Sequence, residues 1–152
     1  MSGTNAATSS DIDAIALALT RSAGRFSKIV GRIPGNAYSP IAWRVLVELD
    51  SDGPARISEL AHRQRIAQPS MTGLAQRLEG EGWVERRPDP ADGRATLVRI
   101  TAAGREALDD YRRSAASRVR PHLADLTDFD RATLARAAEL MQQLSERIEP
   151  HG

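Results

Sequence analysis

Residues 55–101 contain, in one uninterrupted run, two short helical patterns followed by two strand patterns. Apolar residues at helical spacing predict one helix from about Ile57 to Arg63 and a second from about Gln68 to Glu81. Apolar and β-branched residues then predict strands over about 83–88 and 95–100. Two helices joined by a tight turn and followed by a hairpin make a winged helix-turn-helix, which places a helix in the major groove of DNA.

The second helix of this pair has two different faces. At about 100° per residue, Met71, Leu74 and Leu78 share one side with Ala75, whereas Gln76 points the other way. Small and amide side chains on an exposed helix allow close approach to base edges. A DNA-reading helix and an ordinary amphipathic helix with a polar outside explain this pattern equally well when the helix is taken alone.

The loop between the two strands carries an acidic and a basic residue on either side of a glycine. Asp92 and Arg94 are close enough in sequence for the carboxylate to orient the guanidinium, which could then enter a minor groove. The alternative is that this is an Asp-Gly hairpin turn in which the arginine has no function. That explanation would be preferred if the hairpin stood alone, without the preceding helix pair. The predicted DNA-contacting residues of the helices, turn and hairpin are Arg63, Arg65, Gln68, Pro69, Ser70, Thr72, Gly73, Gln76, Arg77, Arg87, Asp92 and Arg94.

Further helical patterns lie on both sides of this segment. Ser10 predicts the N-cap of a first helix that ends at Pro34-Gly35, and Ser39-Pro40 begins a second. Thr101 caps another, which Pro121 breaks or kinks, and a last helix spans about 128–148. The apolar seams of the terminal helices exceed what a core of this size needs. They predict a homodimer interface that includes Ile12, Ile15, Leu19, Leu134, Met141, Leu144 and Ile148.

The predicted fold class is mainly α (α+β). The aromatic content is 4%, and the hydrophobic 41% is dominated by aliphatic residues, which suit helix packing. The expected organisation is a disordered tip over 1–10, a helical dimerisation module formed by 11–38 and 101–150, and a winged helix-turn-helix DNA-binding domain over 39–100.

The charge distribution limits how this chain could bind nucleic acid. Because the net charge is only +1, any such contact must come from local placement of charge. Cysteine is absent, which excludes disulfides, thiolate zinc sites and thiol redox switches in this chain. No apolar run approaches the roughly 20 residues that cross a bilayer, and residues 1–10 lack a signal-peptide pattern. We therefore expect a soluble, cytoplasmic protein without a membrane partner.

On these features the sequence resembles the MarR family of bacterial transcriptional regulators over nearly the whole chain. The most specific motif is the hairpin loop, residues 89–94. The residues that carry the resemblance are Trp43 to Leu46, Ile57 to Ala61, Gln68 to Thr72, Leu74 to Leu78, Gly82 to Arg87, Asp89 to Arg94 and Val98 to Thr101.

This resemblance implies an obligate homodimer, a recognition helix over 68–81, and a wing arginine at Arg94 supported by Asp92. It also implies a cleft for small aromatic or phenolic effectors. Tyr38, Trp43 and Tyr111 are candidate ligand-binding residues, although core or interface packing explains them equally well. The chain departs from the family pattern at Ala67, where relatives often carry a serine cap, and at Gly73, where relatives often carry a longer polar side chain.

Other function classes have weaker support in the sequence. No two of the three histidines, His62, His122 and His151, are four residues apart, and none begins a His-x-Glu motif. The sequence also has no cysteine nucleophile and no glycine-rich phosphate loop. We therefore predict no enzyme and no cofactor. A metal-responsive regulator that uses His62 or His122, and a winged-helix module that binds protein without DNA, remain open. The main prediction is a transcriptional repressor that binds an inverted-repeat operator as a homodimer. We expect a small aromatic or phenolic ligand to release it from the DNA.

Overall fold

The structure, a computed structural model, describes residues 8–148 of the 152-residue chain. It divides into two compact units, one up to Ala115 and one from Ala116 onward. This division falls inside a long helix and differs from the domain boundaries predicted at 38/39 and 100/101, which remain predictions.

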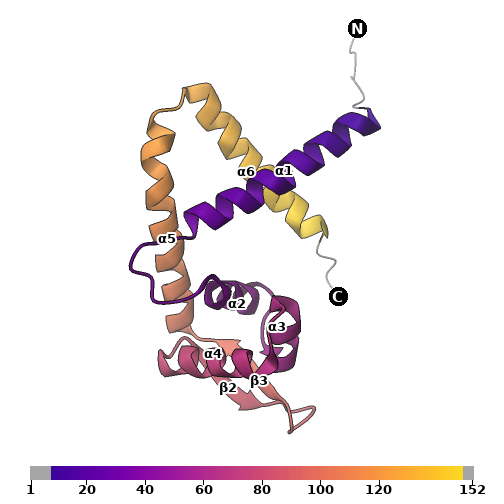
Figure 1. The fold of residues 1–152 in the computed structure, drawn as a ribbon, viewed down its shortest axis with the longest axis vertical. Helices are drawn as coiled ribbons and strands as arrows, with labels where there is room; N and C mark the ends of the chain where they lie inside the picture. The colour runs from indigo at the N-terminus through magenta and orange to yellow at the C-terminus, as the bar shows by residue number, and fades with distance from the viewer. Residues whose placement is uncertain (1–7, 149–152) are drawn as a thin grey trace. The chain divides into compact units, whose positions relative to one another are not determined.

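The elements follow the predicted order, with one additional short strand (Figure 1). The first unit contains α1 (Ser9–Val30), α2 (Pro40–Ser51), β1 (Ala55–Arg56), α3 (Ile57–Gln64), α4 (Gln68–Gly80), β2 (Val84–Pro88), β3 (Thr96–Ile100) and the first part of α5 (Ala102–Ala124). The second contains the end of α5 and α6 (Asp128–Ile148). This confirms the predicted mainly helical winged helix-turn-helix.

The small antiparallel sheet has the strand order β1-β3-β2. β2 and β3 form the predicted hairpin, in which Val84 pairs with Ile100 and Pro88 with Thr96. β1 was not predicted, because two residues are too short to show a strand pattern. It pairs Ala55 with Val98, so the start of α3 is attached directly to the hairpin.

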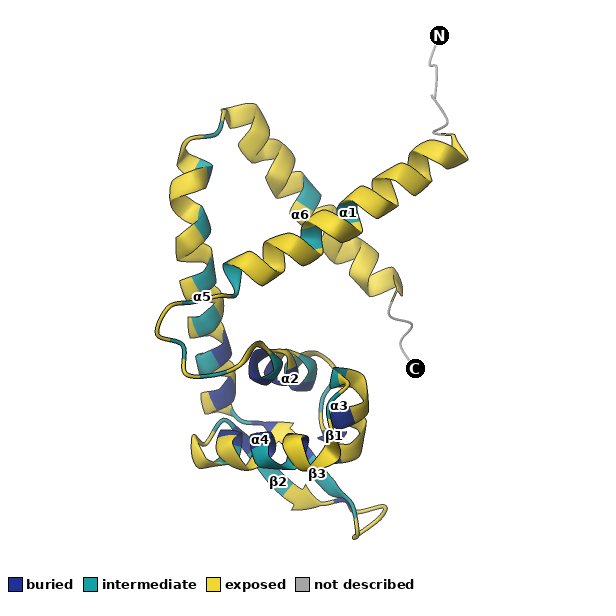
Figure 2. Ribbon diagram, viewed as in Figure 1, coloured by how far each residue is buried: buried dark blue, intermediate teal, exposed yellow. Residues whose placement is uncertain are grey.

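One hydrophobic core joins α2, α3, α4, the sheet and the start of α5. The predicted inner face of α4 is confirmed, since Met71, Leu74, Ala75 and Leu78 are all buried. Figure 2 shows the buried residues of this unit concentrated in these elements, whereas α1 is exposed along most of its length. The core therefore holds α4 and the hairpin together in one unit, called here the head, which comprises α2 to β3 and the start of α5.

The ends of α1 differ from the prediction. The helix begins at Ser9, because Thr8 accepts a hydrogen bond from the Asp11 amide and Asp11 accepts one from the Thr8 amide in return. Ser9 and Ser10 are thus helical instead of belonging to a disordered tip, whose residues 1–7 lie outside the described part. The helix ends at Val30, before Ile33, because Pro34 has no amide hydrogen to continue the pattern.

Pro121 was predicted to break or kink the helix that follows Thr101, and the helix is not broken there. α5 continues to Ala124, so only one turn follows the proline and few backbone bonds depend on it. The predicted cap is confirmed, because the Thr101 hydroxyl oxygen accepts a hydrogen bond from the Gly104 amide at 3.0 Å. The predicted span of α6 is also confirmed.

Candidate nucleic-acid interface

The outer face of α4 is open for contact with another molecule. Pro69, Ser70, Gln76 and Arg77 are exposed there. A Cβ added at Gly73 would meet no atom within 4 Å apart from the neighbouring backbone of its own helix. Small residues therefore leave the middle of this face accessible to close approach, as a helix that enters a groove requires.

The start of α4 has no side-chain cap. Ala67 is the N-cap residue and supplies only its backbone carbonyl, which accepts a hydrogen bond from the Met71 amide at 3.1 Å. The Thr72 hydroxyl donates to the carbonyl of Gln68 at 3.0 Å. The first amides of this helix, which carry its positive dipole end, thus have no internal acceptor side chain.

The loop of the hairpin is held in shape by its own backbone. The Asp89 amide donates to the Ala95 carbonyl at 2.9 Å, and the Ala95 amide donates to the Asp92 carbonyl at 2.8 Å. The Asp92 carboxylate accepts a hydrogen bond from the backbone amide of Arg94 at 3.1 Å. It therefore orients Arg94 through the main chain and not through the guanidinium as predicted, because a two-residue step favours a side-chain-to-backbone turn.

Asp89 holds the base of this wing, a role that the sequence analysis missed. Asp89 is 8% exposed, and its carboxylate accepts a hydrogen bond from the Ala91 amide at 2.8 Å. It also accepts one from Arg56 Nε at 2.6 Å. The Ala91 amide, and then Arg56, hold the pKa of this carboxyl below its ordinary value. The sequence signal for this role was an aspartate directly before Pro90 in a turn.

The arginines of the head fall into two groups. Within residues 54–100, all of which are described, five arginines form ion pairs with carboxylates: Arg56, Arg63, Arg86, Arg87 and Arg99. The other three have no hydrogen bond or ion pair through their guanidinium groups: Arg65, Arg77 and Arg94. The guanidinium groups of the second group are not engaged by any carboxylate of residues 8–148, which leaves them available to neutralise phosphates.

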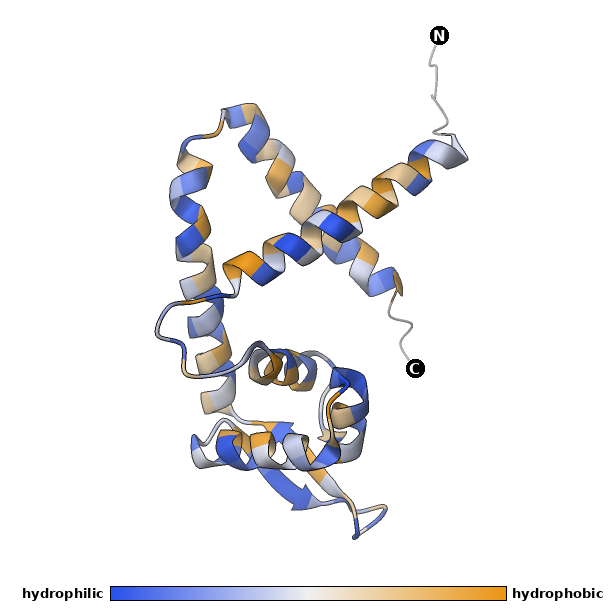
Figure 3. Ribbon diagram, viewed as in Figure 1, coloured by the Kyte–Doolittle hydropathy of each residue, from blue (hydrophilic) through white to orange (hydrophobic). Residues whose placement is uncertain are grey.

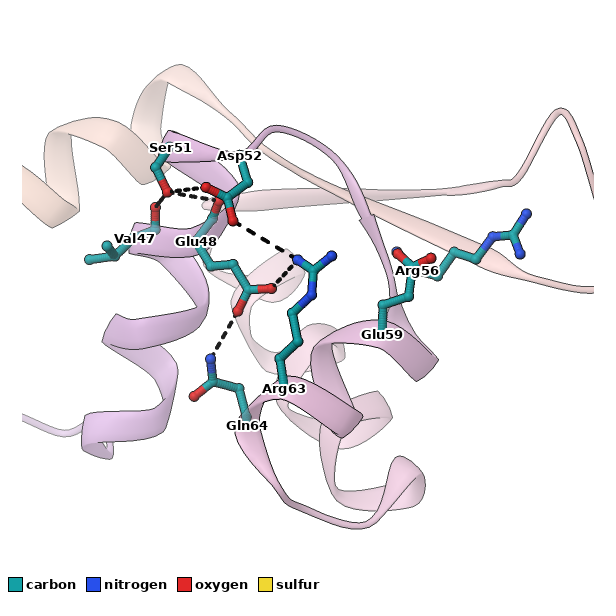
Figure 4. A network of polar contacts seen from close by, with 8 residues as sticks. All are labelled: Val47, Glu48, Ser51, Asp52, Arg56, Glu59, Arg63 and Gln64. Carbon is teal, nitrogen blue, oxygen red and sulfur yellow. Dashed lines mark hydrogen bonds and ion pairs between the residues drawn. The ribbon is translucent and has the colours of Figure 1, made fainter. Parts of the chain in front are cut away.

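Two predicted DNA-contacting arginines thus belong to the paired group. Arg63 Nη1 lies 2.6 Å from Glu48 Oε1 and 4.0 Å from Asp52 Oδ2, so it links α3 to α2 (Figure 4). Arg87 Nη2 lies 3.0 Å from Glu85 Oε2 on its own strand. The partner of Arg63 was not evident from sequence because Glu48 is fifteen residues away.

A groove of about 270 Å³ brings predicted residues of α4 and of the hairpin together. It lies where the starts of α3 and α4 approach the hairpin. Four of its lining residues, Gln68, Thr72, Asp92 and Arg94, were predicted to contact DNA, and its complete lining is Ile57, Ser58, Gln68, Thr72, Arg86, Asp92, Arg94, Ala95 and Thr96. The recognition helix and the wing thus face a common concave surface.

The three predicted ligand-binding aromatics lie together, with Trp83 as a fourth member. The rings of Trp43 and Tyr111 stack with their centroids 4.3 Å apart, and the ring centroids of Tyr38 and Trp83 are 4.8 Å apart. The Tyr38 hydroxyl donates to Glu81 at 2.7 Å, and burial, with this contact, raises its pKa. The indole nitrogen of Trp43 is buried without a hydrogen-bond partner. This aromatic cluster connects the segment before α2 with α2, the start of the hairpin and α5.

Known proteins with similar sequences decide the family. Residues 39–96 match the model of the MarR family. An HTH-type transcriptional regulator of Mycobacterium bovis is 34% identical over 113 residues, which cover 74% of this chain and 79% of that protein. The chain belongs to the MarR family. It is therefore a DNA-binding HTH-type transcriptional regulator and not an enzyme, as predicted.

Other MarR-like proteins extend the comparison. An HTH-type transcriptional repressor of Pseudomonas putida is 32% identical over 92 residues, which are 60% of this chain and 55% of that protein. A transcriptional regulator of Thermotoga maritima has the same fold, with a TM-score of 0.65 and 26% identity over 85% of this chain and 92% of its own. A Bordetella bronchiseptica protein, whose DNA binding is regulated by 6-hydroxynicotinic acid, matches with a TM-score of 0.53 and 22% identity over 84% and 92% of the two chains.

Residues 8–148 were also compared with what a membrane span and a metal site require. None of the helices in this range is both long and apolar enough to cross a membrane. No group of three histidine, aspartate or glutamate side chains in the same range is placed to hold a metal ion. His62 and His122 thus belong to no such group there, and His151 lies outside the described residues.

Proposed function

We propose that this MarR-family regulator is a repressor that binds an inverted-repeat operator as a homodimer in the bacterial cytoplasm and leaves it when a small aromatic ligand binds. The observation that carries the proposal is the common groove, where Gln68 and Thr72 of α4 face Asp92 and Arg94 of the wing. A helix in the major groove and an arginine in the adjacent minor groove can then contact one half-site together.

Uncovered apolar residues on the terminal helices support a dimer. Neither α1 nor α6 buries any of its residues, and apolar positions recur along both helices (Figure 3). On α1, Ile12, Ile15, Phe26 and Ile29 are 49–64% exposed, and on α6, Phe129, Leu134, Leu140, Met141, Leu144 and Ile148 are 36–79% exposed. Contiguous apolar faces of this kind mark protein interfaces. A second copy would bury them and place two recognition helices roughly 34 Å apart.

The aromatic cluster supports a small aromatic effector. The Trp43 indole nitrogen is a buried hydrogen-bond donor without a partner, and a phenol or carboxylate oxygen that reached it would supply the missing acceptor. Through Tyr38 and Glu81 the cluster reaches the end of α4, so ligand binding there would change the placement of the recognition helix. The ligand would favour a dimer in which the two helices no longer match successive grooves. The Bordetella protein supports the ligand class, and the Pseudomonas repressor supports the sign of regulation.

Selection of bound sequences from random DNA by the purified protein tests this proposal. We expect enrichment of an inverted repeat whose half-sites lie about one helical turn apart, and loss of enrichment when a phenol or a hydroxylated aromatic acid is added. Enrichment of a single unrepeated half-site would contradict the dimer. Absence of any salt-dependent DNA affinity would instead favour a module that binds protein.

Arg94→Ala is expected to weaken operator binding by about 1–3 kcal/mol, because an oriented groove arginine is lost. The fold should be unaffected, since the Arg94 guanidinium has no partner in the described residues. A titration at fixed salt and a thermal melt measure the two effects. Arg99→Ala is the matched control, because Arg99 lies in the same hairpin but pairs with Glu85 at 2.5 Å. Unchanged affinity of Arg94→Ala would remove the wing tip from the binding mechanism, and equal weakening by both variants would show that the loss is not specific to Arg94.

Gln76→Ala is expected to reduce discrimination between operator and random DNA by about tenfold or more, because a bidentate amide contact to a base is worth about 1–3 kcal/mol. Affinity for random DNA should change little, since Gln76 carries no charge. Competition binding with both duplexes measures the ratio. A parallel loss on both DNAs would show that Gln76 does not read bases.

A further inference from the structure

The turn between α3 and α4 contains an arginine in a backbone conformation that favours glycine. Arg65 has φ 54° and ψ 44°, in the left-handed region. It is the only residue other than glycine with a positive φ between residues 8 and 148, and the other three such positions are Gly35, Gly53 and Gly82. The chain thus uses glycine at every described left-handed position except this one.

The left-handed conformation at Arg65 is required by the way α3 ends. The Ile66 amide donates to the Ala61 carbonyl at 3.0 Å, and the Arg65 amide donates to the His62 carbonyl at 3.1 Å. This pair of bonds closes a helix through a left-handed residue, at which glycine is preferred. It also turns Ile66 toward the hydrophobic core. Because the backbone is fixed by these contacts, arginine is a less stable choice here than glycine.

Arg63, in the last turn of α3, and Arg65, in the turn after it, have opposite surroundings. The Arg63 guanidinium lies against Glu48, which also accepts a hydrogen bond from Gln64 at 2.9 Å (Figure 4). Arg65 is exposed, and its side chain has no hydrogen bond or ion pair within the described part of the chain. A free cation thus stands two residues before Ala67, the N-cap without a side-chain acceptor.

That position is where a DNA backbone would pass. In a helix-turn-helix the start of the second helix contacts base edges, and the residues just before it lie beside the phosphates. The positive dipole end of α4 and the Arg65 guanidinium would then act on the same phosphate group. A residue that is unfavourable for the fold but suited to the ligand is expected at such a site.

We propose that Arg65 is the phosphate-contacting residue of the turn and is kept there although glycine would make the protein more stable, whereas Arg63 is a positioning residue that holds α3 on α2. This proposal rests on the DNA-binding function above. It also changes the sequence-based expectation, which gave both arginines the same role.

Arg65→Gly tests the proposal with two effects of opposite sign. The melting temperature should rise by about 2–4 °C at fixed protein concentration, because the left-handed backbone is relieved. The selected operator duplex should bind about tenfold more weakly at fixed salt. The slope of log affinity against log salt is negative, and its magnitude should decrease by about one for each protomer on the DNA, because one phosphate contact is lost.

Three further variants separate charge from backbone. Arg65→Lys should keep affinity within about threefold and keep the salt slope. Arg65→Ala should lose affinity as Arg65→Gly does but gain no stability, because alanine is also unfavourable in the left-handed region. Arg63→Ala should lower the melting temperature while leaving the salt slope unchanged.

The proposal is overturned if Arg65→Gly binds the duplex with wild-type affinity and slope, or if it gains no stability. It is also overturned if Arg63→Ala reduces the salt slope as Arg65→Ala does. A wild-type protein without salt-dependent affinity for any duplex would instead refute the DNA-binding function itself, so the two failures are distinguishable.

Discussion

Gly104→Ala is expected to lower the melting temperature by about 10 °C, since overpacking of this kind costs about 3 kcal/mol or more. A Cβ at this position would lie 2.1 Å from the Trp83 carbonyl oxygen and 2.8 Å from Ile100 Cγ1. The carbonyl belongs to the backbone, so no side-chain rotation relieves the clash. The start of α5 would have to move away from the hairpin.

That movement would also break the contacts that attach α5 to the head. The Thr101 amide donates to the same Trp83 carbonyl at 3.0 Å, and the Thr101 hydroxyl donates to the Gly82 carbonyl at 2.6 Å. Gly80→Ala is the matched control, because a Cβ there meets no atom within 4 Å and alanine favours the helix. Thermal melts followed by circular dichroism compare the two. A shift in melting temperature of about 2–4 °C corresponds to about 1 kcal/mol for a chain of this size. A shift of less than about 2 °C for Gly104→Ala would therefore show that the start of α5 can move away from the hairpin at little cost.

Replacing Leu140 and Leu144 together by glutamate is expected to convert the proposed dimer to monomers and to weaken operator binding by at least about a hundredfold. These side chains are 42% and 41% exposed, so an isolated protomer would tolerate the change. A symmetric dimer would bury each leucine twice, with about 1.5–3 kcal/mol for each side chain. The monomer would contact only one half-site, which accounts for the loss of affinity.

Sedimentation or light scattering gives the mass, and an operator titration gives the affinity. Ala135→Glu with Gln142→Glu is the matched control, because it adds the same charge on the opposite, polar side of α6. The dimer proposal fails for this helix if the leucine variant stays dimeric, or if both double variants dissociate equally.

Most of the fold could be predicted from local patterns, and the comparison of particular elements shows why. The inner face of α4 follows from apolar residues at helical spacing, and Met71, Leu74 and Leu78 are buried as expected. Gly82, with φ 74°, ends the turn after α4 where a glycine was expected. The errors lie at element ends, where a single contact decides, such as the Thr8 cap and the continuation of α5 beyond Pro121.

Much less of the candidate site could be predicted. The sequence located the recognition helix and the wing, but it did not distinguish paired from free arginines. Arg56 reaches Asp89 across 33 residues, and Arg63 reaches Glu48 across fifteen. Neither pair shows a periodic pattern, because each depends on how separate elements meet. The same holds for Asp89, whose burial makes it the support of the wing.

The sequence by itself determined the elements and their order, since hydrophobic periodicity, caps and turn residues act over a few positions. It also determined the family, through residues 39–96. Only the tertiary structure decided which charges remain available, because an ion pair requires two groups within a few ångströms whatever their separation in sequence. By that criterion Arg63 belongs to the scaffold of the head, and Arg65, in a left-handed turn, is free to meet DNA.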